Sequence, residues 1–145
     1  MSTQLTPYLS FRDNAKAAMD FYRSVFGGEL ATSRFADFQV SDDPAEQDKI
    51  MHAQLTTEGG MVLMASDTPS EMHYTPGTNY SISLSGKDEA ELRGYWEKLS
   101  GGGIVTMPLA AAPWGDTFGM CTDKFGVQWL VDIAGAGAPG AGQGG

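Results

Sequence analysis

Two segments of the chain carry apolar residues at the spacing of one helix face. The first segment spans residues 14–28 and the second spans residues 88–102. Their apolar stripes are Ala18, Phe21, Tyr22 and Val25, and Leu92, Tyr95, Trp96 and Leu99. Because Asn and Asp favour helix starts and glycine favours helix ends, we predict two helices, capped at the start by Asn14 and Asp88.

The two helical segments belong to a longer repeat. A shift of 74 residues, from Asn14 to Asp88, superimposes the caps, the aromatic pairs and the glycine pairs. Flanking apolar stretches repeat as well, since residues 6–11 match 81–86 and residues 55–64 match 121–130. Each copy therefore predicts a strand, a helix and three more strands. We expect an α+β fold whose paired βαβββ modules form a curled eight-stranded mixed sheet with helices on its outer face.

The repeat also divides the chain. Residues 1–134 are expected to form a single domain, in which module one covers about 5–68 and module two about 80–134, joined by a linker at 69–79. The Gly/Ala-rich residues 135–145 cannot bury apolar surface and predict a flexible tail. An acidic loop at 41–49 is present in the first copy alone.

Alternation along the strand at 81–85 separates its two faces. Ile82 and Leu84 should meet the second helix, whereas Ser81, Ser83 and Ser85 should point to the opposite face. In a curled sheet that opposite face lines a pocket, and in an open sheet it faces water. Both interpretations are compatible with the serines.

Charge and composition narrow the classes of partner. The net charge is −9, from 18 acidic and 9 basic residues, and no stretch gathers Lys and Arg. We therefore expect no nucleic acid and no membrane as partners. No apolar run approaches the ~20 residues of a membrane helix, and the N-terminal segment lacks the pattern of an export signal. With a single cysteine, Cys121, these features predict a cytoplasmic protein that binds a small molecule.

Four segments carry a resemblance to a known family. These are PYLSF at 7–11, the helix and its end at 14–30, MASDTPS at 64–70 and TDKFGVQWLVD at 122–132. They resemble the PhnB-like branch of the vicinal-oxygen-chelate superfamily, a branch that has been mislabelled as demethylubiquinone methyltransferases. The superfamily includes glyoxalases, extradiol dioxygenases and bleomycin-resistance proteins. The likeness covers residues 5–133 and implies the paired-module fold and a homodimer, but no particular reaction.

The resemblance also supplies positions for a metal site. Metal-dependent members carry His and Glu ligands early on the first strand of each module and on its last strand. These places are matched here by Thr6 and Met64 in module one, and by Ser81 and Leu130 in module two. Hard divalent cations need carboxylates or imidazoles, so we expect no tightly held metal and no cofactor. A divalent metal is the alternative, because an alignment slip of two residues would reach Asp132.

Other residues that could carry chemistry are few. His52 could be a general base or a lone ligand, or a hydrogen-bonded structural histidine, and the sequence does not tell which sheet face it occupies. His73 is expected in a solvated loop and Cys121 in the core. Trp114 and Asp116 could orient a flat or cationic ligand, or could pack in an interface. The candidate pocket residues are Tyr8, His52, Met64, Ser81, Ser83, Trp114, Asp116 and Leu130.

Three functions remain open from the sequence, and so does the question of whether the protein is an enzyme. The first is a PhnB-like protein that binds a small organic molecule without a tightly held catalytic metal. The second is a metal-dependent lyase, isomerase or dioxygenase of glyoxalase type, with ligands such as His52 and Asp132 or acids of the 41–49 loop. The third is a drug-sequestering protein of the bleomycin-resistance kind, whose acidic surface would suit a cationic drug.

Overall fold

The structure, a computed structural model, describes residues 3–39 and 42–135. The predicted tail beyond residue 135 and the first residue of the acidic loop, residue 41, lie outside that range. The chain divides into two compact units, Met1–Pro76 and Gly77–Gly145, which we call the first and second modules. The division falls inside the segment predicted to be the linker.

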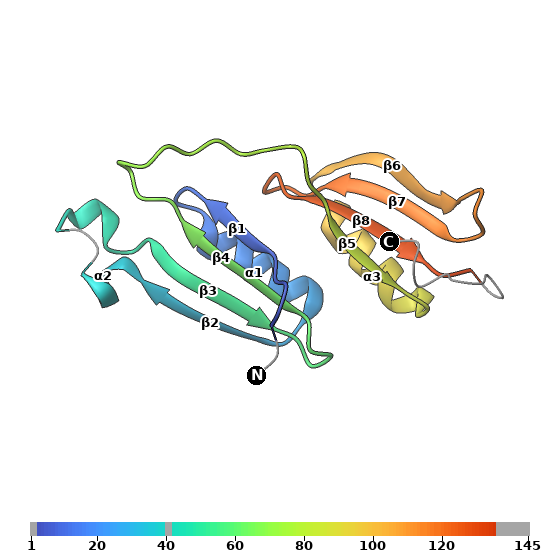
Figure 1. The fold of residues 1–145 in the computed structure, drawn as a ribbon, viewed down its shortest axis with the longest axis horizontal. Coiled ribbons are helices and arrows are strands. Elements are labelled where there is room, and N and C mark those ends of the chain that lie inside the picture. The colour runs from blue at the N-terminus through green and yellow to red at the C-terminus, as the bar shows by residue number, and fades with distance from the viewer. Residues whose placement is uncertain (1–2, 40–41, 136–145) are drawn as a thin grey trace. The chain divides into compact units, whose positions relative to one another are not determined.

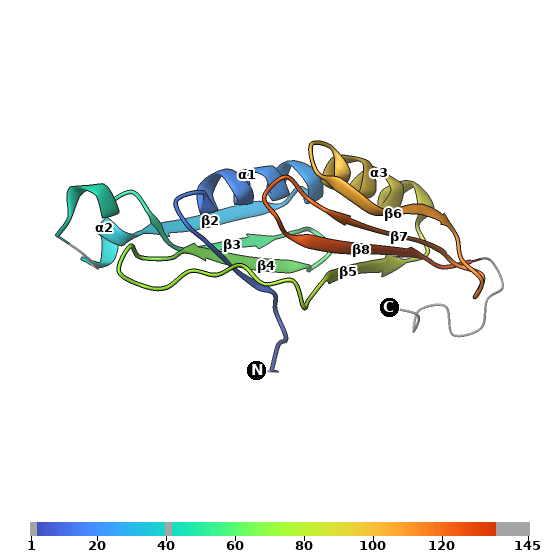
Figure 2. The same cartoon turned by 90° about the horizontal axis from the view of Figure 1, so that it is seen from above.

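The first module is a four-stranded mixed sheet with one long helix on one of its faces (Figures 1 and 2). The strand order is β1-β4-β3-β2, in which β1 is parallel to β4 and the other neighbours are antiparallel. Its elements are β1 (Tyr8–Phe11), α1 (Ala15–Phe26), β2 (Glu29–Arg34), α2 (Phe35–Phe38), η1 (Pro44–Glu46), β3 (Ile50–Thr56) and β4 (Val62–Asp67). The short α2 and η1 extend the module between β2 and β3.

The second module repeats this plan without the insertion. Its sheet has the order β5-β8-β7-β6, again with one parallel pair, β5 and β8, and α3 packs on one face (Figure 2). Its elements are β5 (Ile82–Gly86), α3 (Glu89–Ser100), β6 (Ile104–Ala111), β7 (Thr117–Thr122) and β8 (Gln128–Ile133). The predicted α+β fold of paired βαβββ modules is confirmed. Each module has its own four-stranded sheet, and neither sheet closes on itself.

Strand register confirms the repeat residue by residue. Tyr8 pairs with Met64 in the first module, and Ser83 pairs with Leu130 in the second. The same offsets that align the two sequences therefore superimpose the two parallel strand pairs. The hairpins agree as well, because Gly60 and Gly126 both adopt a positive φ, of 93° and 88°. At that φ a side chain would strain the backbone, which explains the glycine in each turn.

Each module buries the apolar face that its alternation predicts. In the first, the buried side chains of the sheet and of α1 include Phe11, Ala53, Leu55, Leu63, Ala65, Ala18, Met19 and Tyr22. In the second they include Leu84, Leu92, Leu99, Cys121, Trp129 and Val131. Leu84 is buried while Ser83 and Ser85 are exposed, as the serine alternation predicts. The side chains left between the buried ones must lie on the sheet face opposite the helix.

One predicted helix cap is wrong and the other is right. Asp88 caps α3, because its Oδ1 accepts from the Glu91 N–H at 3.1 Å. Asn14 makes no side-chain cap bond to α1. Instead, Asp67 at the end of β4 accepts from the Ala15 N–H at 3.0 Å through Oδ1. Its Oδ2 accepts from the Ile50 N–H at 2.8 Å, so one buried carboxylate joins the start of α1 to the start of β3.

Candidate functional site

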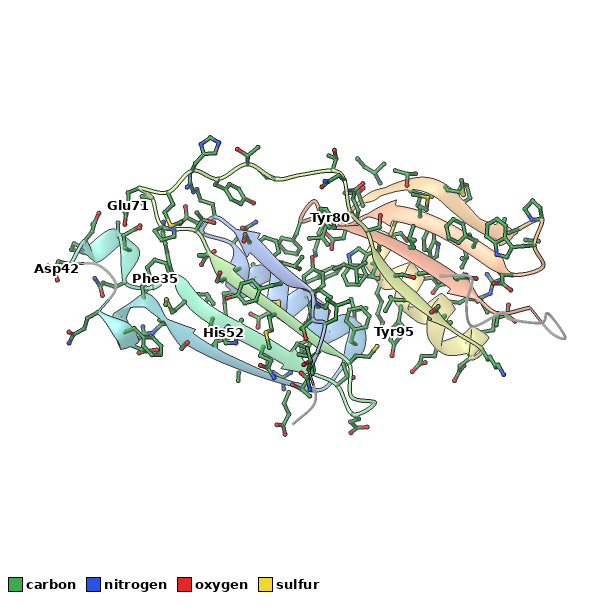
Figure 3. All side chains as sticks on the ribbon, viewed as in Figure 1. Phe35, Asp42, His52, Glu71, Tyr80 and Tyr95 are labelled. Carbon is green, nitrogen blue, oxygen red and sulfur yellow. The ribbon has the colours of Figure 1, made fainter. Side chains whose placement is uncertain are left out.

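The first module presents a phenol and an imidazole on the sheet face opposite α1. The Tyr8 hydroxyl lies 3.3 Å from His52 Nδ1, and the two ring centroids are 5.8 Å apart. Tyr8 is half exposed. His52, which Figure 3 labels, lies on β3 and is partly buried. Their neighbours Leu9 and Ala53 are buried beneath the helix, so alternation places Tyr8 and His52 on the opposite face. The structure thus answers which face His52 occupies.

The side chains that the strand register places beside Tyr8 carry no charge. Register places Met64 beside Tyr8 and Gln54 beside Met64, so the three form a row across β1, β4 and β3. Met64 and Gln54 are both partly buried. A phenol, an imidazole, an amide and a thioether together offer hydrogen-bond donors and acceptors beside apolar surface. This mixture can orient a small organic molecule by its polar atoms while covering its carbon skeleton.

The second module has a different set at the corresponding places. Ser83 and Leu130 are paired across β5 and β8, with Ser83 exposed and Leu130 partly buried. A Cβ on Gly119 would lie 2.9 Å from Trp96 of α3, so Gly119 and its partner Val131 face the helix. The next residues along β7 and β8 therefore face away from α3, and this face is the one that carries Leu130.

Two buried carboxyl groups meet at the edge of that second face. Asp132 is 1% exposed and Asp116 is 2% exposed. The two lie beside each other, because Thr117, the residue after Asp116, pairs with Ile133, the residue after Asp132. Burial, followed by the hydrogen bond and the charge of Asp116, raises the pKa of Asp132 to about 6. The Gly135 N–H, which donates to Asp116 Oδ1 at 3.0 Å, is the main cause that lowers the pKa of Asp116, followed by the bond with Asp132.

Trp114 belongs to the same corner of the second module. Its ring meets the Phe118 ring edge to face, with centroids 5.5 Å apart, and it remains 54% exposed. Trp114 also contributes to lowering the pKa of Asp116. The structure therefore brings Trp114, Asp116 and Asp132 together, whereas the sequence left Asp132 as a remote metal alternative. The sequence did contain a signal for a buried acid, because Asp132 lies within the apolar run of β8.

The positions matched to metal ligands do not fit a divalent metal. Thr6 and Ser81 precede the first strands of their modules, and Met64 and Leu130 lie on the last strands. They offer hydroxyls, a thioether and a hydrocarbon, none of which replaces the hydration of a hard cation. Within residues 3–39 and 42–135, no three His, Cys, Asp or Glu side chains gather to hold a metal ion.

The acids of the 41–49 loop serve local structure. Glu46 and Lys49 form a buried ion pair, with 2.8 Å between Oε2 and Nζ. The Lys49 hydrogen bond lowers the pKa of Glu46 to about 2, helped by bonds with Ser70. Burial acts to lower the pKa of Lys49, but its bonds with Glu46 and Asp13 outweigh burial and raise it. Asp43 caps η1 through the Ala45 N–H at 2.9 Å. These contacts tie the insertion to its own module.

The remaining candidates have structural roles. His73 is exposed and bonds Thr75 within the linker, as expected for a loop residue. Cys121 is buried, and burial, followed by the charge of Asp123, raises the pKa of its thiol to about 11. Asp123 was not singled out in the sequence. Its carboxylate accepts from the N–H groups of Phe125, Val127 and the Trp129 indole, which closes the last hairpin.

Comparison with known proteins identifies the family. A family model described as 3-demethylubiquinone-9 3-methyltransferase matches residues 3–132, most of the chain. The chain belongs to this family. A Pseudomonas aeruginosa protein, PA1353, is 40% identical, with a TM-score of 0.77, over 91% of this chain and 98% of that chain. A Bacillus cereus PhnB protein is 28% identical, with a TM-score of 0.73, over 91% of this chain and 100% of that chain.

The same fold extends beyond the PhnB-like family. A glyoxylase/bleomycin resistance protein/dioxygenase domain from Frankia sp. EAN1pec has a TM-score of 0.63 at 18% identity, over 92% of this chain and 98% of that chain. At that identity the likeness concerns the fold alone. The prediction of a PhnB-like protein is therefore confirmed, and so is the prediction that it has the fold of the glyoxalase and bleomycin-resistance proteins. Its relatives do not assign an activity. Among the described residues, no helix is long and apolar enough to cross a membrane.

Proposed function

We propose that this PhnB-like protein binds a small organic molecule on the first module, on the sheet face opposite α1, without a tightly held catalytic metal. The observation that carries the proposal is the contact between Tyr8 and His52, 3.3 Å apart, with Met64 beside Tyr8. The phenol and the imidazole can each donate or accept one hydrogen bond to a ligand oxygen or nitrogen. The flexible thioether adapts to the carbon skeleton.

The metal-free part of the proposal rests on donor chemistry. The resemblance matches Thr6, Met64, Ser81 and Leu130 to the positions where metal-dependent members of the superfamily carry His and Glu. We expect far less than one metal ion per chain after the protein is incubated with Ni, Mn, Zn or Mg and then desalted, measured by elemental analysis. Retention of about one ion per chain would overturn this part.

The two histidines of the chain provide a matched pair for the binding test. Small-molecule collections would be screened by the rise in melting temperature of the full chain, which reports binding to the native state. Ligands that stabilise the wild type should lose most of that effect with His52→Gln or Tyr8→Phe. They should keep it with His73→Gln, which alters the exposed linker histidine. If all three variants respond like the wild type, the proposed face is not the binding site.

We further propose that the protein is a cytoplasmic homodimer. The edge strand β6 exposes Ile104, Val105 and Met107, which supports an apolar contact between copies. The single free cysteine fits a reducing compartment. Sedimentation of the wild type and of Val105→Glu should give a dimer and a weakened dimer, and a wild-type monomer at all concentrations would contradict the assembly.

A further inference from the structure

The buried acids of the second module have no cation to neutralise them. Asp116 and Asp132 are almost completely buried, yet none of the ion pairs in the described residues includes either. No Lys, Arg or His contributes to the pKa shift of either group. Two ionised carboxylates in contact repel each other, and burial removes the water that would screen them. One negative charge is the most that this geometry accommodates.

Hydrogen bonding leads to the same requirement. Asp116 Oδ2 and both carboxyl oxygens of Asp132 are buried and receive no N–H or O–H from other groups. A buried acceptor without a donor costs about 1–3 kcal/mol, so such groups need an explanation. A proton on Asp132 supplies the missing donor, because a carboxylic acid has an O–H that can bond the Asp116 carboxylate.

The elements packed around the pair contribute no other titratable group. Asp132 lies between Ser85 of β5 and Phe118 of β7 in the sheet register. Apart from Asp132 and the thiol of Cys121, β5, β6, β7 and β8 contain no residue with an ionisable side chain. Cys121 pairs with Trp129 and is buried on the helix side of the sheet, away from Asp132. The helix α3, which carries acidic and basic residues, packs on that opposite face.

We propose that Asp116 and Asp132 share one proton, with Asp132 as the donor, and that this proton latches the turn at 112–116 to the C-terminal end of β8. The turn is already tied at both ends. The Ala112 N–H donates to the Asp116 carbonyl at 2.8 Å, and the Gly135 N–H donates to the Asp116 carboxylate. The shared proton adds the bond between the turn and the strand itself. Loss of the proton leaves two buried negative charges facing each other.

The latch has a predicted direction with pH. The pKa of Asp132 is raised from 3.8 to about 6, so the folded protein holds this proton more tightly than the unfolded chain. Stability from the latch is therefore complete at low pH and is lost as pH rises from about 4 to about 6. The Trp114 ring belongs to the latched turn and contacts Phe118. Its fluorescence should change near pH 6, where the folded protein loses the proton and the turn loosens.

Asp132→Asn tests the latch directly, because its amide donates to Asp116 at every pH. At about pH 7.5 this variant should melt at a higher temperature than the wild type, and at about pH 4.5 the two should be alike. Asp123→Asn is the matched control in the same module. It weakens three hydrogen bonds to a buried carboxylate and should lower the melting temperature at both pH values.

Carboxyl-carbon NMR of the full wild-type chain measures the proton itself. One aspartate should titrate near pH 6, and this titration should disappear in Asp116→Asn. The step in fluorescence near pH 6 should be absent in Trp114→Phe. If every aspartate titrates with a pKa near or below its ordinary value, the proposal of a shared proton is wrong. A melting temperature that rises with CaCl2 or MgCl2 in the wild type but not in Asp132→Asn would also overturn it, because the pair would then hold a cation instead.

Discussion

The two modules share a backbone plan but distribute their polar groups differently. On the face opposite the helix, the first module has Tyr8 and His52 in contact, and the second has Ser83 at the place of Tyr8. Beneath the helix, the first module ends β4 with the buried Asp67, where the second has Ile133. The duplicated apolar pattern is enough to build the fold twice. Polar residues at a few positions then give each copy its own chemistry and its own pH response.

The largest expected effect comes from making the first module like the second at one position. Asp67→Ile removes the acceptor of two buried N–H groups, those of Ala15 and Ile50. Each buried donor left without a partner costs about 1–3 kcal/mol, so the variant should lose about 4 kcal/mol of unfolding free energy. Urea denaturation would measure the loss. The control Ile133→Val at the matching place should cost about 1 kcal/mol, since it only trims packing.

A smaller effect is expected at the insertion that only the first module has. Lys49→Met leaves Glu46 buried without its cation, which should cost about 3 kcal/mol. Lys16→Met breaks an exposed pair with Asp20 and should change the free energy of unfolding by less than about 0.5 kcal/mol. Equal losses in these two variants would contradict a structural role of the buried pair.

The sharpest contrast is the opposite pH response of the two modules. The pKa of Glu46 is lowered from 4.5 to about 2, so its contribution is present above pH 4.5 and is lost as pH falls toward 2. Asp132 acts in the other direction, because its raised pKa weakens the second module as pH rises from about 4 to about 6.

The distribution of tryptophan makes that contrast measurable. Trp96, Trp114 and Trp129 all belong to the second module, so indole fluorescence reports that module alone. Hydrogen exchange of the β3 amides, such as Ala53 and Leu55, reports the first module. As pH falls from about 6 to about 4, the fluorescence-monitored melting temperature should rise while β3 protection stays level. Parallel changes in both signals would show that the two acids do not act separately.

Local pattern was sufficient to predict both helices, the strand alternation and the repeat, because each depends on neighbours a few residues apart. Partnerships between distant residues were not predictable in the same way. Asn14 was predicted to cap α1, but the cap comes from Asp67, 52 residues from Ala15. The contact of Tyr8 with His52 spans 44 residues and depends on the sheet order. The order of strands in a sheet cannot be read from the periodicity of apolar residues. Both residues were nevertheless among the candidate pocket residues.

The pairing of Asp116 with Asp132 is a second partnership that the sequence alone did not predict. Asp116 and Asp132 were each noticed in the sequence, one beside Trp114 and the other as a distant metal alternative. Their proximity follows from β7 and β8 being antiparallel neighbours, which brings the end of one strand to the start of the other. The roles of Glu46, Lys49 and Asp123 depend on burial that composition does not reveal. Ligand binding at the predicted residues stays a prediction.

Cys121 has a practical consequence for studying the protein in solution. The sole thiol of the chain is buried, and its pKa of about 11 keeps it protonated and poorly nucleophilic at neutral pH. Maleimide dyes or spin labels should therefore react with cysteines introduced on exposed positions and leave the native one unmodified. One label on each module would allow the distance between the two labels to be measured in solution, without first replacing the native cysteine.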